Sequence, residues 1–167
     1  MIERYSRKEM SEIWSDQFRF STWLQIEILA CQARANMGEI PQEDVDVIKE
    51  KANFEVNRIL EIEETTQHDV IAFLTNVAEY VGAPSRHIHY GMTSSDVVDT
   101  ALSYQMKKAG ELLLTGLFNL AETLKLRGNE HKRTYCIGRS HGIHAELTTF
   151  GLKFANWYME TQRNIER

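Results

Sequence analysis

The sequence predicts an all-α protein, built as an N-terminal helical domain followed by the start of a long-helix bundle. Apolar residues recur every three or four positions over most of the chain, which is the period of one face of an α-helix. The chain has only two prolines, both before residue 85, and few glycines, so long uninterrupted helices are expected. Sustained alternation of apolar and polar residues, which would indicate half-buried strands, is weak throughout.

Five helices are expected in the first half of the chain, each bounded by a cap residue, a glycine or a proline. Their expected positions are from Arg7, from about Asp16 to Met37, around Val45 to Ile48, within Phe54 to Thr65, and from Asp69 to Val81. The first follows Ser6-Arg7-Lys8-Glu9, which has the spacing of a capping box. Asp69 suits the start of the fifth helix because its carboxylate can accept hydrogen bonds from unpaired backbone amides.

The longest expected helix begins at the polar cluster Thr93-Ser94-Ser95-Asp96, which is a strong N-cap signal. Apolar residues continue without a proline, so this helix is expected from Ser94 to about Arg127, roughly 35 residues, a length typical of helical bundles. After a polar break, another apolar pattern runs from Phe150 to the end of the chain without a C-cap signal. We therefore expect a truncated chain whose last helix lacks its partner.

Composition excludes several classes of function. The net charge is −5, so binding to nucleic acid has no electrostatic support. No apolar run approaches the length of a membrane span, and the N-terminus lacks the apolar core of a signal peptide. Cys31 and Cys136 lie far apart and form no CxxC pair, which argues against a disulfide framework and a zinc site. We expect a cytoplasmic protein that binds neither nucleic acid nor membrane.

Three polar breaks between helices share one chemistry: Gln67-His68-Asp69, His89 to Asp96, and Arg139 to His144. Each combines hydroxyl, imidazole or amide groups with a helix start, and helix N-termini attract anions through their unpaired amides. Thr93 and Ser94 are suited to hold a carboxylate or phosphate, although helix capping alone also explains this pair.

The third break is the part of the chain best suited to chemistry. Gly138 and Gly142 bracket Arg139-Ser140-His141, and His144 follows three residues later. Buried, hydrogen-bonded histidines are the alternative interpretation of His141 and His144. Near the N-terminus, Arg4 and Tyr5 bring a cation and a phenol together, and a solvated chain end is the alternative there.

Metal binding and a serine nucleophile are not expected. The pairs His141-x-x-His144 and His87-x-His89 have plausible ligand spacing, but neither comes with cysteine, and the Glu-x-x-His pairs of di-iron bundles are absent. Ser140 and His141 are adjacent, and adjacent residues seldom face one another as a nucleophile and its base must.

Four ordered segments carry a resemblance to a known family: Met1 to Ser6, Gln67 to Asp69, His89 to Ala101, and Gly138 to Gly151. On these segments, the chain resembles the N-terminal part of the adenylosuccinate lyases, a family of the fumarase/aspartase superfamily. The resemblance spans essentially the whole chain in order and spacing. It implies a fumarase/aspartase-like fold, with residues 1–111 as the N-terminal helical domain and 112–167 as the beginning of the central helical bundle.

The resemblance also implies a reaction. These lyases release fumarate by β-elimination from adenylosuccinate, giving AMP, and from the succinylated aminoimidazole ribotide SAICAR, and no cofactor or metal is expected. His141 matches the family's general acid, and His68 matches a second histidine that assists at the phosphate or the leaving group. The substrate-binding positions of the family match Arg4, Tyr5, Gln67, His68, Asp69, His89, Thr93 and Ser94.

Two residues depart from the family pattern. Gln67 stands where Arg or Lys is common, and Leu147 stands where Pro is common. The family's catalytic serine lies in a later segment, and family sites are assembled from several subunits of a homotetramer. We therefore expect this chain alone to be inactive. The alternatives are another lyase of the superfamily, such as argininosuccinate lyase, or a non-catalytic helical scaffold.

Overall fold

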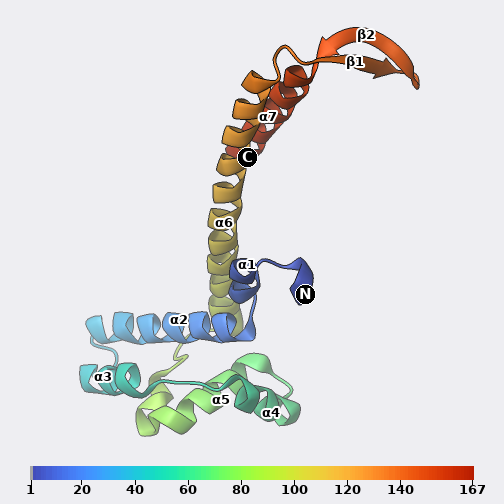
Figure 1. Ribbon diagram of the computed structural model, residues 1–167. Coiled ribbons are helices and arrows are strands. Elements are labelled where there is room, and N and C mark those ends of the chain that lie inside the picture. The colour runs from blue at the N-terminus through green and yellow to red at the C-terminus, as the bar shows by residue number, and fades with distance from the viewer. Residues whose placement is uncertain (1) are drawn as a thin grey trace. The chain divides into compact units, whose positions relative to one another are not determined.

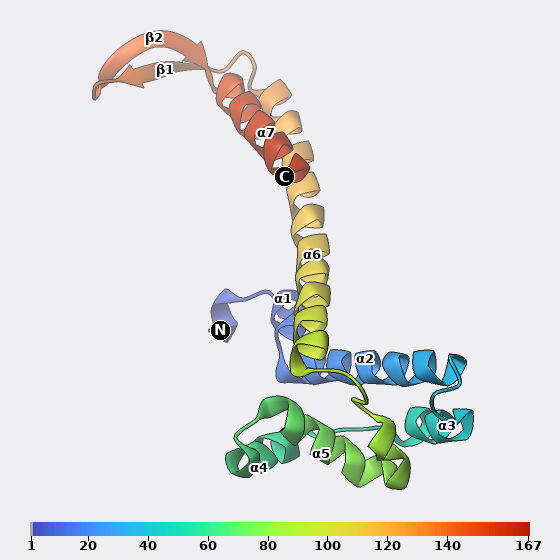
Figure 2. The same ribbon diagram turned by 180° about the vertical axis from the view of Figure 1, so that it is seen from behind.

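The computed structural model describes residues 2–167, apart from the side chain of Glu3, and most of these residues are helical. Figures 1 and 2 show the chain from opposite sides. The elements in order are η1 (Glu3–Tyr5), α1 (Lys8–Ile13), α2 (Asp16–Asn36), α3 (Gln42–Lys51), α4 (Val56–Thr66), α5 (Asp69–Val81), η2 (Ala83–His87), α6 (Ser94–Glu130), β1 (Tyr135–Ser140), β2 (Ile143–Thr149) and α7 (Phe150–Glu166). The all-α prediction is confirmed for the great majority of the chain.

The chain divides into two compact units, Met1–Ala109 and Gly110–Arg167, so the division falls within the long helix α6. The division of the chain into lyase domains at residues 1–111 and 112–167 stays a prediction. None of the helices in residues 2–167 combines the length and the apolar character that crossing a membrane requires.

Four aromatic rings form the centre of the first unit, where α2 lies alongside α3 and α4 pairs with α5 (Figure 1). Phe20 and Phe73 stack with their centroids 5.8 Å apart, and Trp23 meets both rings edge-on at 5.2 and 5.5 Å. Phe54 closes the cluster from the segment before α4, with centroids 6.1 Å from Phe20 and 6.3 Å from Phe73. This cluster fixes α2 and α5, the helices that position the first two polar breaks.

In the second unit, α7 folds back along the end of α6 (Figures 1 and 2). The two helices cross where Gly128 meets Gly151, and a Cβ on Gly151 would lie 2.6 Å from the Gly128 carbonyl oxygen. A ring cluster of His131, Phe150 and Phe154 packs beside this crossing, with centroid distances from 4.9 to 5.9 Å. Close approach of the two backbones therefore requires glycine at the crossing.

Despite the weak alternation in the sequence, residues 135–149 form an antiparallel hairpin of β1 and β2. His141 and Gly142 form its two-residue turn, with φ angles of 51° and 77°. Positive φ at both central residues is the conformation of the type I′ hairpin turn. Most residues of the hairpin are exposed, so it has no buried face that would impose alternation on the sequence.

The predicted capping box at Ser6 and Glu9 was wrong. Helix α1 has Arg7 as its N-cap, without a side-chain hydrogen bond. The hydroxyl of Ser6 instead donates to the carbonyl of Ile2, at 3.1 Å, and so stabilises the turn of η1. The starts of α6 at Ser94 and of α5 at Asp69 are confirmed.

Candidate functional site

The first polar break joins α4 to α5 through a left-handed residue. Gln67 has φ 51° and ψ 31°, and its side-chain amide donates to the Glu64 carbonyl oxygen at 2.8 Å. The next residue, His68, is the N-cap of α5, where its Nδ1 accepts a hydrogen bond from the backbone N–H of Ile71 at 3.4 Å. Gln67 thus closes one helix while His68 opens the next.

The bond at Nδ1 determines the proton arrangement of His68. A neutral imidazole that accepts at Nδ1 carries its proton on Nε2, which is then available as a donor. The Asp69 carboxylate lies 3.6 Å from the same Nδ1, and both side chains are about half exposed, at 47% and 48%. An ion pair with Asp69 needs a proton on Nδ1, so the helix cap and the ion pair exclude one another.

The second polar break is the loop between η2 and α6, and a buried acid holds it. The backbone N–H of His89 donates to Glu27 Oε2 at 2.8 Å, and His89 Nδ1 lies 2.6 Å from Glu27 Oε1. Glu27 belongs to α2 and its side chain is 1% exposed, whereas the His89 side chain is 17% exposed. His89 adopts φ 64°, in the left-handed region that residues other than glycine adopt uncommonly.

Two further contacts anchor the same loop. Asp44 Oδ2 accepts a hydrogen bond from Arg86 and lies 2.8 Å from His87 Nε2. The Cys31 thiol donates to the His87 carbonyl oxygen at 3.4 Å. Burial, reinforced by the nearby carboxylate of Glu27, raises the pKa of Cys31 to about 11, so the thiol keeps its proton and remains a donor.

The start of α6 is capped by Asp96 rather than by a hydroxyl. Asp96 Oδ2 accepts a hydrogen bond from the backbone N–H of Thr93 at 2.8 Å. In the described part of the chain, the hydroxyls of Thr93 and Ser94 take part in no hydrogen bond, so capping does not account for these side chains. Thr93 is exposed and Ser94 is half-buried. Both hydroxyls remain available to a ligand at the N-terminus of α6.

Arg4 and Tyr5 form a local pair in η1. The Arg4 guanidinium donates to the Tyr5 hydroxyl at 3.0 Å and lies 4.8 Å from the centroid of its ring. Both residues are exposed. Pairing with Tyr5 keeps the charge of Arg4 accessible to solvent.

The polar breaks of the first unit are separated along the chain by α5 and η2. His68 precedes the first residue of α5, and η2 begins two residues after its last, Val81. A 13-residue α-helix is about 20 Å long, so α5 separates the first break from the start of η2, and the second break follows η2 at His89. No hydrogen bond or ion pair found within residues 2–167 joins Arg4, His68 and His89 to one another.

The third break lies in the second unit, where His141 occupies the turn of the β1–β2 hairpin. His144 is paired across the strands with Arg139, and both histidines are exposed. The alternative interpretation of His141 and His144 as buried histidines is therefore wrong. Gly138 lies so close to β2 that a Cβ would be 2.9 Å from the Glu146 carbonyl oxygen, which explains why this position is glycine.

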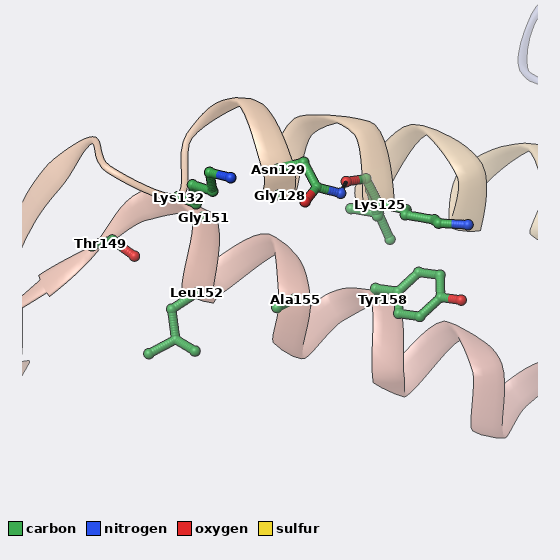
Figure 3. A pocket seen from close by; sticks show the side chains of 10 residues that line it. Lys125, Gly128, Asn129, Lys132, Thr149, Gly151, Leu152, Ala155 and Tyr158 are labelled. Atoms are coloured by element: carbon green, nitrogen blue, oxygen red, sulfur yellow. Dashed lines mark hydrogen bonds between the residues drawn. The ribbon is translucent and has the colours of Figure 1, made fainter.

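One cavity, of about 270 Å³, is lined by Gln67 together with Leu60, Glu63 and Glu64, but by no other residue predicted to bind substrate. Figure 3 shows another, of about 350 Å³, between α6 and α7, with Lys125 and Tyr158 at one end and Gly151 at the other. None of the residues predicted to bind substrate lines this cavity. Among the described residues, no group of three or more His, Cys, Asp or Glu side chains is arranged to hold a metal ion.

Sequence reasoning missed Glu27. Its signal is the spacing of Phe20, Trp23, Glu27 and Cys31, which places an acid within the buried stripe of α2. A buried acid is rare unless it is paired, so an acid at such a position indicates a partner elsewhere in the chain. The partner, His89, lies 62 residues further on, and no pattern along the chain connects the two.

Comparison with known proteins relates the chain to one family. A protein family described as "Lyase" matches residues 3–167. The chain belongs to this lyase family. The adenylosuccinate lyase of Bacillus subtilis (strain 168) is 56% identical to this lyase chain over 167 residues, and that of Streptococcus mutans serotype c is 52% identical. Each alignment covers 100% of the chain and 39% of the relative, so the chain spans well under half of their length.

Solved structures of other lyases share the fold. The crystal structure of a fumarate lyase from Mesorhizobium sp. BNC1 has a TM-score of 0.91 and 25% identity, covering 98% of this chain and 39% of that one. The 3-carboxy-cis,cis-muconate lactonizing enzyme from Pseudomonas putida has a TM-score of 0.90 and 27% identity, with the same coverage. The predicted fumarase/aspartase-like fold class is therefore confirmed.

Proposed function

We propose that this lyase chain supplies the general acid and part of the substrate-binding residues of an adenylosuccinate lyase. The reaction releases fumarate from adenylosuccinate, giving AMP, and from SAICAR. The observation that carries the proposal is the 56% identity to the Bacillus subtilis adenylosuccinate lyase along all 167 residues. The superfamily resemblance alone would leave the substrate open.

In the proposed reaction, a base removes the proton beside a carboxylate, the electron pair forms the double bond of fumarate, and the carbon–nitrogen bond breaks. The departing nitrogen then takes a proton from an acid, for which we propose His141. Imidazole suits this role because it exchanges protons near neutral pH. His141 is exposed in the turn of the β1–β2 hairpin and is not packed in the protein core, which supports this role. Both proton transfers need only protein side chains, so we propose no cofactor or metal.

Substrate binding is proposed for the other polar breaks. The substrate carries two carboxylates and a phosphate, and helix N-termini favour such anions. His68 and Asp69 lie at the N-terminus of α5, with the His68 Nε2 proton free to donate or to assist at the leaving group. At the start of α6, the available hydroxyls of Thr93 and Ser94 are suited to anionic oxygens.

Gln67 has a reduced role in this proposal. Its amide nitrogen donates to the Glu64 carbonyl oxygen, so that group helps to end α4. Gln67 also lacks the charge of the Arg or Lys common at this position in the family, and an anion gains less from a neutral amide. Arg4, which stays accessible beside Tyr5, is proposed as a charged contact instead.

We further propose a homotetramer with sites shared between subunits. Helix α5 and η2 separate the first break from the second along the chain, and no hydrogen bond or ion pair within residues 2–167 joins His68 to His89. In the second unit, several large apolar side chains of α6 and α7 are exposed, as expected of a bundle face that another subunit covers: Leu113, Phe118, Leu126, Leu152 and Met159. A cytoplasmic location is also proposed, in line with the two free cysteines.

The test is His141→Gln in the full-length protein that carries this chain. Glutamine keeps polarity and approximate size but cannot donate a proton as an acid. We expect kcat for adenylosuccinate to fall by about 10²- to 10⁴-fold, with assembly retained in sedimentation. The control is His144→Gln, for which kcat should fall less, because His144 lies on a strand rather than in the turn.

Three results would contradict the proposal. If His141→Gln keeps near-normal turnover while His144→Gln is inactive, His141 is not the general acid. A wild-type protein that cleaves argininosuccinate but not adenylosuccinate would belong to another lyase of the superfamily. A wild-type protein that binds these compounds without cleaving either would favour the scaffold. Residues 1–167 expressed alone are expected to be inactive.

A further inference from the structure

Glu27 differs from every other buried polar side chain among the described residues, because it alone is charged. The buried polar side chains are Thr22, Glu27, Asn76, Gln105 and Thr161. The other four bond to backbone groups of the helical scaffold: Thr22 and Thr161 donate to the carbonyl four residues back, Asn76 accepts from the Glu55 N–H, and Gln105 donates to the Ile13 carbonyl. Those bonds need no charge, whereas Glu27 brings a negative charge into the buried stripe of α2.

Both carboxylate oxygens of Glu27 are used by one residue. Oε2 accepts from the His89 backbone N–H at 2.8 Å, and Oε1 lies 2.6 Å from His89 Nδ1. Burying a carboxylate is costly unless hydrogen bonds and an opposite charge compensate it. A carboxylate can only accept, so ionised Glu27 takes a hydrogen bond from His89 Nδ1–H as well as from the backbone N–H.

The pair therefore fixes both the orientation and the tautomer of His89. Nδ1 carries a proton and points at Glu27, which leaves Nε2 as the ring nitrogen without a partner in residues 2–167. The His89 side chain is 17% exposed, so the accessible edge of its ring is small. The Glu27 carboxylate also accepts from the His89 backbone N–H and so holds the left-handed backbone at φ 64°. Four residues later, the chain reaches the available hydroxyls at the N-terminus of α6.

We propose that Glu27 is a positioning residue that presents His89 Nε2 to an anionic oxygen of the substrate. An anion at Nε2 requires a donor there, and hence a ring that carries a proton on each nitrogen. The Glu27 carboxylate balances the positive charge of that ring and prevents it from turning. The inference rests on the proposed function, because it takes the ligand at His89 to be the substrate of that reaction.

A purely structural role for Glu27, as an anchor of the loop before α6, is the competing explanation. The chain offers a matched control, because Asp44 anchors the same loop through His87 Nε2 at 2.8 Å and through Arg86. No hydrogen bond or ion pair within residues 2–167 joins Asp44 to His89. If Glu27 only anchors the loop, Asp44→Asn and Glu27→Gln should change the KM for adenylosuccinate alike. If Glu27 orients the imidazole, only Glu27→Gln should change it.

The experiment compares the full-length wild-type protein with Glu27→Gln and Asp44→Asn. For Glu27→Gln we expect the KM for adenylosuccinate to rise about tenfold or more, as for loss of one hydrogen bond to a charged group, with kcat little changed. The inhibition constant of AMP or of fumarate should rise in parallel, and which product is affected identifies the anionic group at His89. Asp44→Asn should leave the KM close to that of the wild type.

A second measurement depends on neither turnover nor the variant's stability. Nitrogen-15 spectra of the wild-type imidazoles should show a proton on Nδ1 of His89, facing Glu27, rather than the Nε2-protonated tautomer that neutral free histidine prefers. A ring protonated at Nε2 alone would overturn the proposal, as would an unchanged KM in Glu27→Gln or an equal rise in both variants. Absence of adenylosuccinate cleavage by the wild type would instead refute the proposed function itself, so the two failures are distinguishable.

Discussion

Gly151→Ala tests the helix crossing that supports the second unit. An ideal Cβ at Gly151 would lie 2.6 Å from the Gly128 carbonyl oxygen, 2.6 Å from Lys132 Cα and 2.7 Å from Lys132 N. All three atoms belong to the backbone, so no side-chain rotation can relieve the overlap. Helix α7 must therefore move away from α6, which weakens the hydrogen bond from the Gly151 N–H to the His131 carbonyl oxygen, now 2.9 Å long.

The expected cost follows from three contributions. Overpacking against a fixed backbone costs about 1–3 kcal/mol, and overlap with three backbone atoms places this site at the upper end. Loss of the hydrogen bond adds about 1 kcal/mol. Alanine regains about 1 kcal/mol of helix propensity relative to glycine. The sum is a destabilisation of about 2–3 kcal/mol for Gly151→Ala.

Urea unfolding followed by far-ultraviolet circular dichroism measures this change, and hydrogen exchange of the α7 amides reports the second unit separately. The control is Gly116→Ala, also in a helix of the second unit, where a Cβ would have nothing within 4 Å. That variant should be stabilised by up to about 1 kcal/mol, because only helix propensity changes. If Gly151→Ala is as stable as Gly116→Ala, the close crossing of α6 and α7 does not exist in solution.

Two further predictions concern groups whose pKa values the fold displaces. Hydrogen bonds from Arg58 and then Asn76 hold the pKa of Glu79 below its ordinary value of 4.5, so its contribution to stability is complete above that pH and lost as the pH falls through the lowered value. The stability difference between wild type and Arg58→Met, measured by urea unfolding, should therefore be present at pH 6 and shrink in acid; a difference independent of pH would contradict this. The buried Cys31, with its pKa raised to about 11, should react with iodoacetamide at pH 8 far more slowly than Cys136, as peptide mass spectrometry can measure, and the contrast should disappear in urea. Equal rates in the folded protein would mean that α2 opens readily at Cys31.

The candidate site was predictable where its signals were local. The Thr93-to-Asp96 cluster predicts the start of α6 because capping involves residues only three apart, and Asp96 bonds Thr93 as that spacing requires. Asp69 likewise predicts the start of α5. The hairpin around His141 was missed because its strands are exposed and lack an alternating pattern, although the left-handed turn itself needs only His141 and Gly142.

By itself, the sequence determined the helical period, the positions of the polar breaks and the resemblance to one family of lyases, since each depends on neighbouring residues or on their order. Only the tertiary structure decided that Glu27 belongs to His89, because burial in the α2 core and two hydrogen bonds across 62 residues leave no pattern along the chain. It also decided why Gly151 has no side chain, since that depends on backbone atoms of Gly128 in α6 and of Lys132 just after α6. The physical reason is the same in both cases: the energy of a buried charge or a close packed contact is set by atoms distant in sequence, and those atoms come together only in the folded chain.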